Sequence, residues 1–304
     1  MTKRILITGG SGLFALNYSL AIRERYPITL GMHERNISLQ KVNTEYLSLD
    51  RIDDLLIKFN DLKPEIVIHA AGLTNVEQCE AKPIEAEHIN INLTENIANA
   101  CVKNGAKLVL ISTDHLFSGD TPLVDESHNV MPMNTYARTK AKAEEVALSI
   151  CNNSLIIRTN FYGWGLSYRS SFSDMIISAL RNNKELTLFK DVFYTPILIE
   201  TLANSVIDLI RVNASGIFHI VGDERISKYE FGMSIAKHFN LDPTLIRSGT
   251  LASNSSLVKR PLDMSLSNKK ICKLLGKNLG GVNVHIQRLI QQEKLGHAKE
   301  LKSL

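Results

Sequence analysis

Short apolar runs alternate with amphipathic stretches along the first two-thirds of the chain. The apolar runs are rich in Val, Ile and Leu, which is typical of strands that are buried on both faces of a parallel sheet. They predict strands over residues 4–8, 26–32, 45–49, 65–71, 107–113 and 154–159. Stretches with helical spacing of apolar residues lie between them, and they predict helices over residues 12–25, 51–61, 84–104 and 136–151. This alternation predicts an α/β fold whose doubly wound, Rossmann-like parallel sheet is covered by helices on both faces.

The alternation becomes irregular after Arg158. A loop rich in glycine and aromatic residues comes first. The later pattern predicts a helix over 198–212, a strand over 216–222, a helix over 227–239 and a loop over 249–268. We therefore expect a smaller α/β lobe that is partly interleaved with the first domain. We expect a dinucleotide-binding domain over 1–159, to which residues 190–221 return. The substrate lobe would comprise 160–189 and 222–285. Residues 286–304 would form a polar C-terminal helix that frays.

The composition argues against several classes of protein. The chain has 304 residues, 44% hydrophobic and 22% charged, with a formal charge of +4, which fits a well-cored protein that favours small anionic ligands. No block of Lys and Arg with interleaved aromatic residues occurs, so we expect no nucleic-acid partner. The cysteines are scattered without a CxxC pair, which predicts neither disulfides nor a metal site. The first apolar run is too short for a signal peptide or a membrane span, so we expect a cytoplasmic protein.

A glycine-rich turn follows the first predicted strand and opens the first predicted helix. It has the sequence TGGSGLFA over residues 8–15, in which Ala15 replaces the third glycine of the usual pattern. Glycines let backbone N–H groups approach a pyrophosphate, to which the helix N-terminus adds partial positive charge. This position therefore predicts a dinucleotide site with contacts from Gly9, Gly12, Leu13 and Phe14.

The end of the second predicted strand bears on the choice of cofactor. An acidic residue here usually binds the ribose hydroxyls of NAD. The sequence reads GMHER, in which His33 occupies the expected position and the carboxylate Glu34 follows it. Arg35 could reach a 2′-phosphate, which favours NADP(H) over NAD(H). The alternative is that Arg35 is a solvated loop residue.

Tyr136 and Lys140 are one helical turn apart, so their side chains share a face of the predicted helix. Tyrosine has an ordinary pKa of about 10, and a neighbouring ammonium lowers that pKa by favouring the phenolate. Such a tyrosine can give a proton to a carbonyl oxygen as hydride reaches the carbon. Thr113 ends the fifth predicted strand, at the carboxyl edge where α/β sheets bind ligands. We expect these three residues to line one crevice with the glycine turn.

The order and spacing of these segments resemble those of a known family. The sequence is similar to the extended short-chain dehydrogenases/reductases, and most similar to dTDP-4-dehydrorhamnose reductase and related sugar-nucleotide reductases, over roughly residues 3–276. The segments that carry the resemblance are TGGSGLFA, HAAGLTNVEQCEAKP, NINLTEN, ISTDHLFSG, YARTK, RTNFYGWG, FYTPILIETLA, GIFHIVGDERISKYEFG and KRPLDMSLSNKKI.

The resemblance implies roles for the matching residues. Tyr136 would protonate the C4 oxygen of the sugar, and Thr113 would orient the substrate carbonyl. Lys140 would tune Tyr136 and bind the nicotinamide ribose, and Asn90 would act in a proton relay near the lysine. The remaining cofactor contacts implied are His33, Arg35, Asp50, Ala70 and Ala71. The residues that would face the sugar nucleotide are Thr74, His115, Asn160, Trp164 and Arg260. The alternatives are that Trp164 is a core aromatic residue and that Arg260 joins a loop to a carboxylate.

Departures from the family patterns narrow the reaction that the resemblance implies. Related dehydratases carry Thr-Asp-Glu where this chain has Thr113, Asp114 and His115, so the second carboxylate is missing. Relatives that epimerise before they reduce use a cysteine, and residues 102–150 contain none. The implied function is NADP(H)-dependent reduction of the 4-keto group of a 4-keto-6-deoxy nucleotide sugar. The family's dTDP-sugar reductases commonly have tyrosine at position 115, which leaves the identity of the sugar open.

Two other functions stay open at this point. One is a non-catalytic NADP-binding subunit, because the regulatory subunit of methionine adenosyltransferase also resembles these reductases. The other is a nucleotide-sugar epimerase that keeps its NAD bound. Relatives often dimerise, and for any of the three functions the helices over 84–104 and 136–151 could support a homodimer.

Overall fold

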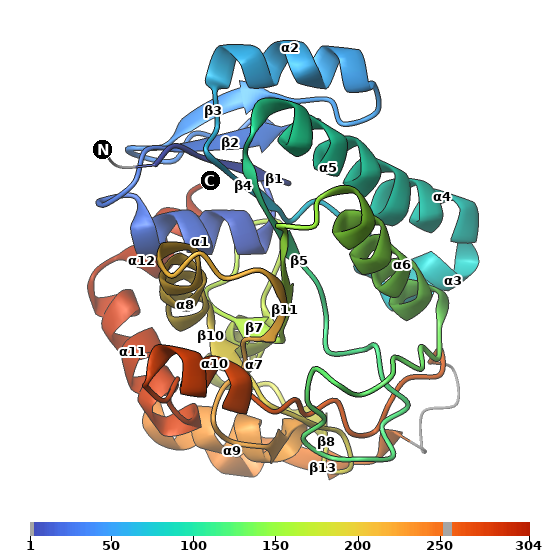
Figure 1. Ribbon diagram of the computed structural model, residues 1–304. Helices are drawn as coiled ribbons and strands as arrows, with labels where there is room; N and C mark the ends of the chain where they lie inside the picture. Colours follow the sequence, from blue (N-terminus) through green and yellow to red (C-terminus); the bar gives the residue numbers. More distant parts are fainter. Residues whose placement is uncertain (1–2, 252–256) are drawn as a thin grey trace.

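The computed structural model describes residues 3–251 and 257–304 and is built around a parallel sheet (Figure 1). The described part of the sheet has seven strands in the order β11-β6-β5-β4-β1-β2-β3, and every neighbouring pair is parallel. The strands are β1 (Ile5–Thr8), β2 (Ile28–Met32), β3 (Asn43–Tyr46), β4 (Ile66–His69), β5 (Lys107–Ile111), β6 (Leu155–Arg158) and β11 (Gly216–His219). The predicted doubly wound, Rossmann-like α/β fold is confirmed.

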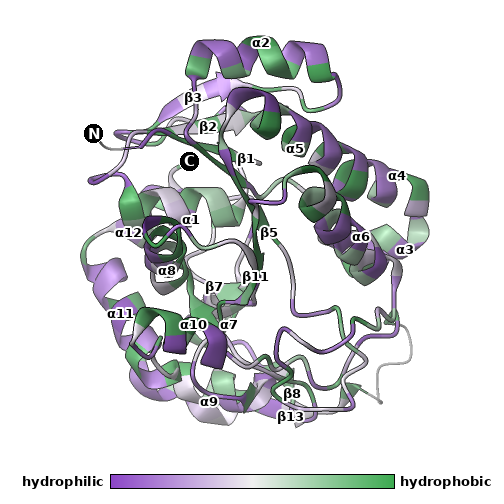
Figure 2. Cartoon of the chain, in the orientation of Figure 1, coloured by the Kyte–Doolittle hydropathy of each residue, from purple (hydrophilic) through white to green (hydrophobic). Residues whose placement is uncertain are grey.

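Helices cover both faces of this sheet, and each face has its own hydrophobic core (Figures 1 and 2). Because side chains alternate along a strand, Ile5 and Ile7 of β1 belong to one core and Leu6 to the other. The helices α1 (Leu13–Ile22) and α8 (Ile199–Arg211) pack on the first core. The helices α2 (Ile52–Leu62), α5 (Leu93–Asn104) and α6 (Thr135–Ile150) pack on the second core.

The helix predicted over 84–104 is interrupted. Helix α3 (Val76–Ala81) precedes it, and the stretch itself divides into α4 (Pro83–Glu87), a π-helical turn over His88–Asn92, and α5. Asn75 caps α3 by accepting a hydrogen bond from the backbone N–H of Gln78. Single π-helical turns are frequent at functional sites, and this turn contains Asn90.

The irregular second half forms three small two-stranded pairings, β7 with β10, β9 with β12 and β8 with β13. The elements are β7 (Phe161–Tyr162), α7 (Phe172–Arg181), β8 (Leu186–Phe189), β9 (Phe193–Tyr194), β10 (Ile197–Leu198), β12 (Ile226–Ser227), α9 (Lys228–His238), a 3-10 turn (Pro243–Leu245), β13 (Ile246–Gly249) and α10 (Lys269–Leu275). In the loop expected over 249–268, residues 252–256 lie outside the described residues. The division of the chain into two domains stays a prediction.

The C-terminal segment does not fray as expected. It forms α11 (Val282–Lys294) and α12 (His297–Lys302), whose Leu289 and Leu301 are completely buried. A guanidinium nitrogen of Arg23 in the α1 region lies 2.5 Å from a carboxylate oxygen of Glu300. The prediction was wrong because the many polar residues here lie on the outer faces and conceal a narrow apolar stripe.

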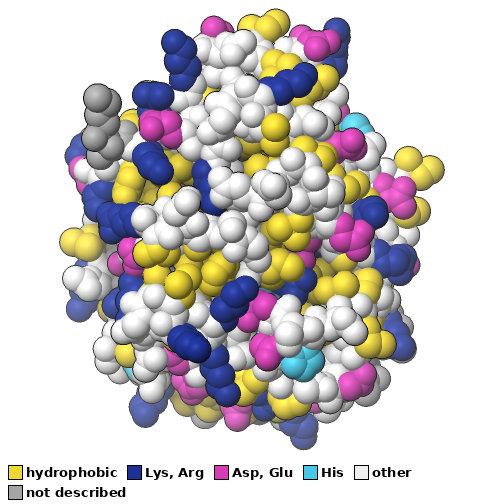
Figure 3. All heavy atoms as spheres, in the orientation of Figure 1, with side chains coloured by type: hydrophobic (Ala, Val, Ile, Leu, Met, Phe, Trp, Pro, Cys, Tyr) yellow, Lys and Arg dark blue, Asp and Glu magenta, His cyan; other side chains and the backbone are white. Residues whose placement is uncertain are grey.

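The face shown in Figure 3 intersperses positive and negative side chains over most of its area. It has no extended region of a single sign, which agrees with the small formal charge of +4. None of the helices in the described part of the chain is both long and apolar enough to span a membrane.

Candidate active site

The glycine turn is held tightly against the end of β4. Gly9 has a φ of +68°, and a side chain on it would approach the backbone of Ala71 to 2.9 Å, so only glycine fits. The backbone N–H of Gly12 donates to the carbonyl of Gly9 at 2.8 Å, and Gly12 then caps α1. The turn therefore presents backbone at the N-terminus of a helix, the arrangement that favours phosphate groups.

A buried network joins the ends of β1 and β4 beside this turn. The hydroxyl of Thr8 bonds to Nδ1 of His69 at 2.7 Å and accepts the N–H groups of Ala70 and Ala71 at 3.2 and 3.3 Å. Nε2 of His69 bonds to Thr94 at 3.1 Å. Burial lowers the pKa of His69 to about 3, so this histidine is a neutral structural residue.

Two hollows meet at the glycine turn and share Gly9 and Ala71 in their walls. The first, which we call the central pocket, has a volume of about 260 Å³, and the second, the adjacent pocket, about 400 Å³. The predicted residues that line the central pocket are Gly9, Gly12, Leu13, Phe14, Ala70, Ala71, Thr74, Thr113, His115, Tyr136, Lys140 and Asn160. Two pockets that share Gly9 of the glycine turn offer space for a ligand with two halves joined by phosphates.

The adjacent pocket contains His33 and Asp50 among the predicted cofactor residues. A carboxylate oxygen of Asp50 lies 2.8 Å from Nε2 of His88, and Leu47 and Leu49 add apolar surface. Arg35 does not line either pocket. Its guanidinium carbon lies 3.9 Å from the ring centroid of Tyr168.

Tyr136 and Lys140 both line the central pocket from α6. The pKa of the phenol and the hydrogen-bond partner of the amine differ from what the sequence suggested. The amine of Lys140 donates to the carbonyl of Ile111, at the end of β5, at 2.8 Å. Burial lowers the pKa of Lys140 to about 8, while the charge of Glu144, one turn further along α6, opposes that shift.

The pKa of Tyr136 is raised rather than lowered as expected. Burial raises it to about 12, while the nearby Thr113 hydroxyl and the charge of Arg169 oppose the rise. The expectation was wrong because removal of the phenol from water outweighs the Thr113 hydrogen bond and the charge of Arg169. The phenol therefore stays protonated at neutral pH and can act as an acid.

The residues after β5 complete the wall opposite the glycine turn. The side-chain amide of Asn160 donates to the buried carboxylate of Asp114 at 2.5 Å. The rings of His115 and Tyr136 meet edge to face, with centroids 5.6 Å apart. Burial lowers the pKa of His115, and Nδ1 of this ring has no hydrogen-bond partner among the described residues. His115 is therefore a neutral ring against the phenol.

Comparison with known proteins identifies the family. The model of the RmlD substrate binding domain family matches residues 3–295. The chain belongs to this family. It is 26% identical to dTDP-4-dehydrorhamnose reductase from Aggregatibacter actinomycetemcomitans, over 90% of this chain and 93% of the relative. It is 25% identical to methionine adenosyltransferase 2 subunit beta from Xenopus laevis, over 81% and 75%. The predicted family resemblance is confirmed.

A solved structure supports the same relationship. The crystal structure of dTDP-4-dehydrorhamnose reductase from Bacillus anthracis in complex with NADP superimposes with a TM-score of 0.84. It is 26% identical in sequence, and the match covers 96% of this chain and 100% of that chain. This member of the RmlD substrate binding domain family therefore shares its overall architecture with a reductase that binds NADP.

Besides Arg35, three predicted site residues lie elsewhere in this RmlD-family chain. Trp164 is 1% exposed in the hydrophobic core, and its indole N–H donates to the carbonyl of Leu289 at 3.2 Å, so the expectation that it faces the sugar was wrong. Arg260 is outside the central pocket lining and pairs with the carboxylate of Glu77. Both side chains therefore follow the alternatives stated for them: Trp164 is a core aromatic residue, and Arg260 joins its loop to a carboxylate.

Asn90, the third, does not contact the lysine amine. Its amide donates to the carbonyl of Leu73 at 3.1 Å and to the Thr139 hydroxyl at 3.0 Å, and its oxygen accepts the N–H of Leu73 at 2.8 Å. These bonds occupy both N–H donors of the Asn90 amide, and they hold the segment that precedes Thr74 against α6. The structure therefore favours a positioning role over the expected proton relay.

Three functional candidates were missed in the sequence. Phe161 and Arg169 line the central pocket. Lys228 lies behind Asp114 and Tyr194, with its amine 3.3 Å from the centroid of the Tyr194 ring. Burial lowers the pKa of Lys228 to about 8 against the opposing charge of Asp114. All three lie in or beyond the irregular segments, where no periodic pattern shows which side chains point inward.

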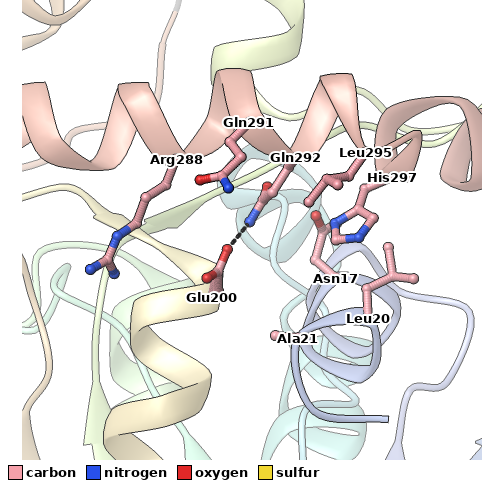
Figure 4. Close-up of a pocket in the computed structure, with 9 residues that line it drawn as sticks. All are labelled: Asn17, Leu20, Ala21, Glu200, Arg288, Gln291, Gln292, Leu295 and His297. Carbon is pink, nitrogen blue, oxygen red and sulfur yellow. Dashed lines mark hydrogen bonds between the residues drawn. The ribbon is translucent and has the colours of Figure 1, made fainter. Parts of the chain in front are cut away.

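A separate pocket lies between α1, α8 and α11 (Figure 4). The Gln292 amide donates to Glu200 at 2.5 Å across it, and Arg288 extends away along α11. Arg288 donates to the Thr201 hydroxyl at 3.1 Å. These contacts join α11 to α8, and none of the predicted catalytic residues lines this pocket.

Proposed function

We propose that this chain uses a reduced nicotinamide cofactor, NADPH in preference to NADH, to reduce the 4-keto group of a 4-keto-6-deoxy nucleotide sugar. The observation that carries the proposal is the convergence of Thr113, Tyr136 and Lys140 on the pocket that the glycine turn lines. The family, and the reductase names of its relatives, support the same reaction.

The residues present fit a dinucleotide. The glycine turn leaves backbone open at the start of α1, and a side chain on Gly9 would collide with Ala71. When bound, the reduced nicotinamide supplies the hydride that adds to the carbonyl carbon. Lys140, held at Ile111, would bind the ribose hydroxyls, and its pKa of about 8 keeps it mainly cationic at neutral pH.

Tyr136 and Thr113 would act on the carbonyl oxygen. The hydroxyl of Thr113 would hold that oxygen beside the phenol. Tyr136, still protonated because burial raises its pKa to about 12, would transfer its proton to the oxygen as hydride reaches the carbon. The sugar thus gains one hydride and one proton, and the phenolate that remains recovers a proton from solvent after turnover.

The preference for NADPH rests on Arg35 and on the relative that binds NADP. Arg35 lies beyond the second strand with its charge over the Tyr168 ring, and no aspartate or glutamate occupies the strand end at His33. The Bacillus anthracis relative is described in complex with NADP. Replacement of Arg35 by Gln should weaken NADPH binding and leave NADH binding unchanged in fluorescence titrations; equal loss for both cofactors would contradict the preference.

The direct test is oxidation of NADPH with a panel of 4-keto-6-deoxy nucleotide sugars. Wild-type protein should consume NADPH with at least one sugar, and Tyr136→Phe should lose about 10²–10⁴-fold in turnover while its NADPH affinity changes little. Tyr26→Phe is the matched control, because the Tyr26 hydroxyl accepts a hydrogen bond from the Arg211 guanidinium on the surface. Full activity of Tyr136→Phe would remove that residue from the mechanism.

A regulatory subunit is the second candidate, because of the similarity to methionine adenosyltransferase 2 subunit beta. The same experiment separates the two functions. NADPH binding without turnover on any sugar of the panel would favour the subunit. Interconversion of sugars without added NADPH would instead indicate the epimerase alternative.

A further inference from the structure

A short turn over residues 166–169 ends in Arg169, whose side chain lines the central pocket. Reciprocal backbone hydrogen bonds join Leu166 and Arg169 at 2.8 and 3.4 Å. The Tyr168 hydroxyl donates to the carbonyl of Ser11 in the glycine turn at 2.7 Å, and the Ser167 hydroxyl donates to the carbonyl of Leu304 at 2.7 Å. Hydrogen bonds to the glycine turn and to the C-terminal residue therefore hold this turn in place, and they fix the backbone position of Arg169.

The charge of Arg169 is not neutralised by any carboxylate of the described residues within ion-pair distance. The partner of its guanidinium is the neutral Thr74 hydroxyl, at 2.9 Å. Arg158 and Arg260, by contrast, each pair with a glutamate. A guanidinium has five N–H donors, so Arg169 retains donors and a full charge at the edge of the pocket.

We infer that Arg169 binds the diphosphate of the nucleotide-sugar substrate at the mouth of the central pocket, with Thr74 as its partner; this rests on the proposed function. Guanidinium groups bind phosphate oxygens through paired, charge-assisted hydrogen bonds. Arg169 also lies close enough to Tyr136 for its charge to lower the pKa of that phenol. A sugar held through its diphosphate at Arg169 can therefore extend its ring towards the acid.

The two diphosphates that meet in such a site are distinguished by the contacts of the turn. Tyr168, not Arg169, lies over the glycine turn where the cofactor pyrophosphate is expected. Arg169 donates to Thr74, in the loop after β4. The position of Arg169 beside Thr74 therefore fits the substrate diphosphate better than the cofactor pyrophosphate.

Calorimetric titration of Arg169→Gln with dTDP and, separately, with NADPH tests the inference. UDP, GDP and CDP are titrated alongside, and the nucleoside diphosphate that wild type binds most tightly is used. Loss of a hydrogen bond to a charged group costs about 1.5–3 kcal/mol, so Arg169→Gln should bind it about ten- to a hundredfold more weakly and bind NADPH as wild type does. Arg169→Lys should recover part of the loss. Arg247→Gln, which removes an exposed arginine paired with Glu185, should behave as wild type.

The outcomes separate this inference from the proposed function. Unchanged nucleoside diphosphate affinity in Arg169→Gln overturns the inference alone, and so does a loss confined to NADPH, which would assign Arg169 to the cofactor. If wild type binds NADPH but none of the four nucleoside diphosphates, the nucleotide-sugar reductase function fails, and the inference fails with it.

Discussion

Replacing Glu144 by Gln should destabilise the protein strongly, because it leaves Arg158 as a buried charge without a counter-ion. Both side chains are only 4% exposed, and their closest N–O contact is 2.7 Å. Two further contacts, at 3.0 and 3.1 Å, make the pair bidentate. Removing one member of such a pair costs about 3–5 kcal/mol. The free energy of unfolding, measured by urea denaturation at pH 7, should fall by that amount.

Glu145→Gln is the matched control for this experiment. Glu145 is the next residue of α6, but it is 62% exposed and pairs with Lys142 on the surface. Its replacement should change the free energy of unfolding by no more than about 0.5 kcal/mol. Equal losses for the two variants would refute the claim that burial of the Glu144 pair sets the magnitude.

The same substitution has a second, functional readout. The charge of Glu144 raises the pKa of Lys140 against the effect of burial. Without it, the pKa of Lys140 should fall further below its ordinary range, and the loss of turnover at alkaline pH should begin at a lower pH in Glu144→Gln than in wild type. An unchanged pH profile would show that Glu144 does not act on the lysine.

Three further results are expected. Turnover should fall as pH rises above about 8, because the cationic form of Lys140 is lost there; Lys140→Arg, if active, should remove this fall from the pH–rate profile. Trp164→Phe should cost about 0.5–1.5 kcal/mol in urea denaturation because it removes the buried hydrogen bond from the indole N–H to the Leu289 carbonyl, and NADPH oxidation per folded molecule should not change. Asn90→Ala should lower kcat/KM without shifting the pH profile, whereas a shift would restore the proton-relay role.

The central sheet could be predicted from the sequence because its strands are buried on both faces. Each of the six strands expected before residue 160 corresponds to an observed strand, usually trimmed by a residue or more at its ends. A run such as Ile5–Ile7 must be apolar throughout, since alternate side chains enter different cores. Pairings such as β9 with β12 involve two residues per strand and are set by tertiary contacts. The local sequence pattern therefore does not predict them.

The interrupted helix shows where local signals existed and where they did not. Asn75 and Pro83 are ordinary helix-start residues, and they mark α3 and α4. The π-helical turn at His88–Asn92 has no such marker. It places Asn90 where its amide bonds to Leu73 and to Thr139, and both partners are distant in the sequence.

The site was predicted best where its residues are close in the chain or follow a strand. Tyr136 and Lys140 share a helix face, and Thr113 follows β5, so local geometry brings them to the central pocket. Trp164 and Arg169 lie in one irregular segment, and only tertiary packing decides which of them turns inward. The Asn17 side chain bonds to both the N–H and the carbonyl of Trp164, at 3.2 and 2.9 Å, and this fixes Trp164 in the core.

The opposite pKa shifts of Tyr136 and Lys140 have one cause. Burial disfavours the charged form of each group, so it raises the pKa of the phenol to about 12 and lowers that of the amine to about 8. An acid with a pKa of about 12 holds its proton until a stronger base appears beside it. A carbonyl oxygen becomes such a base only as hydride adds to its carbon. Tyr136 therefore keeps its proton until hydride adds to the carbonyl carbon, and the charge of Arg169 favours the phenolate after the proton has left.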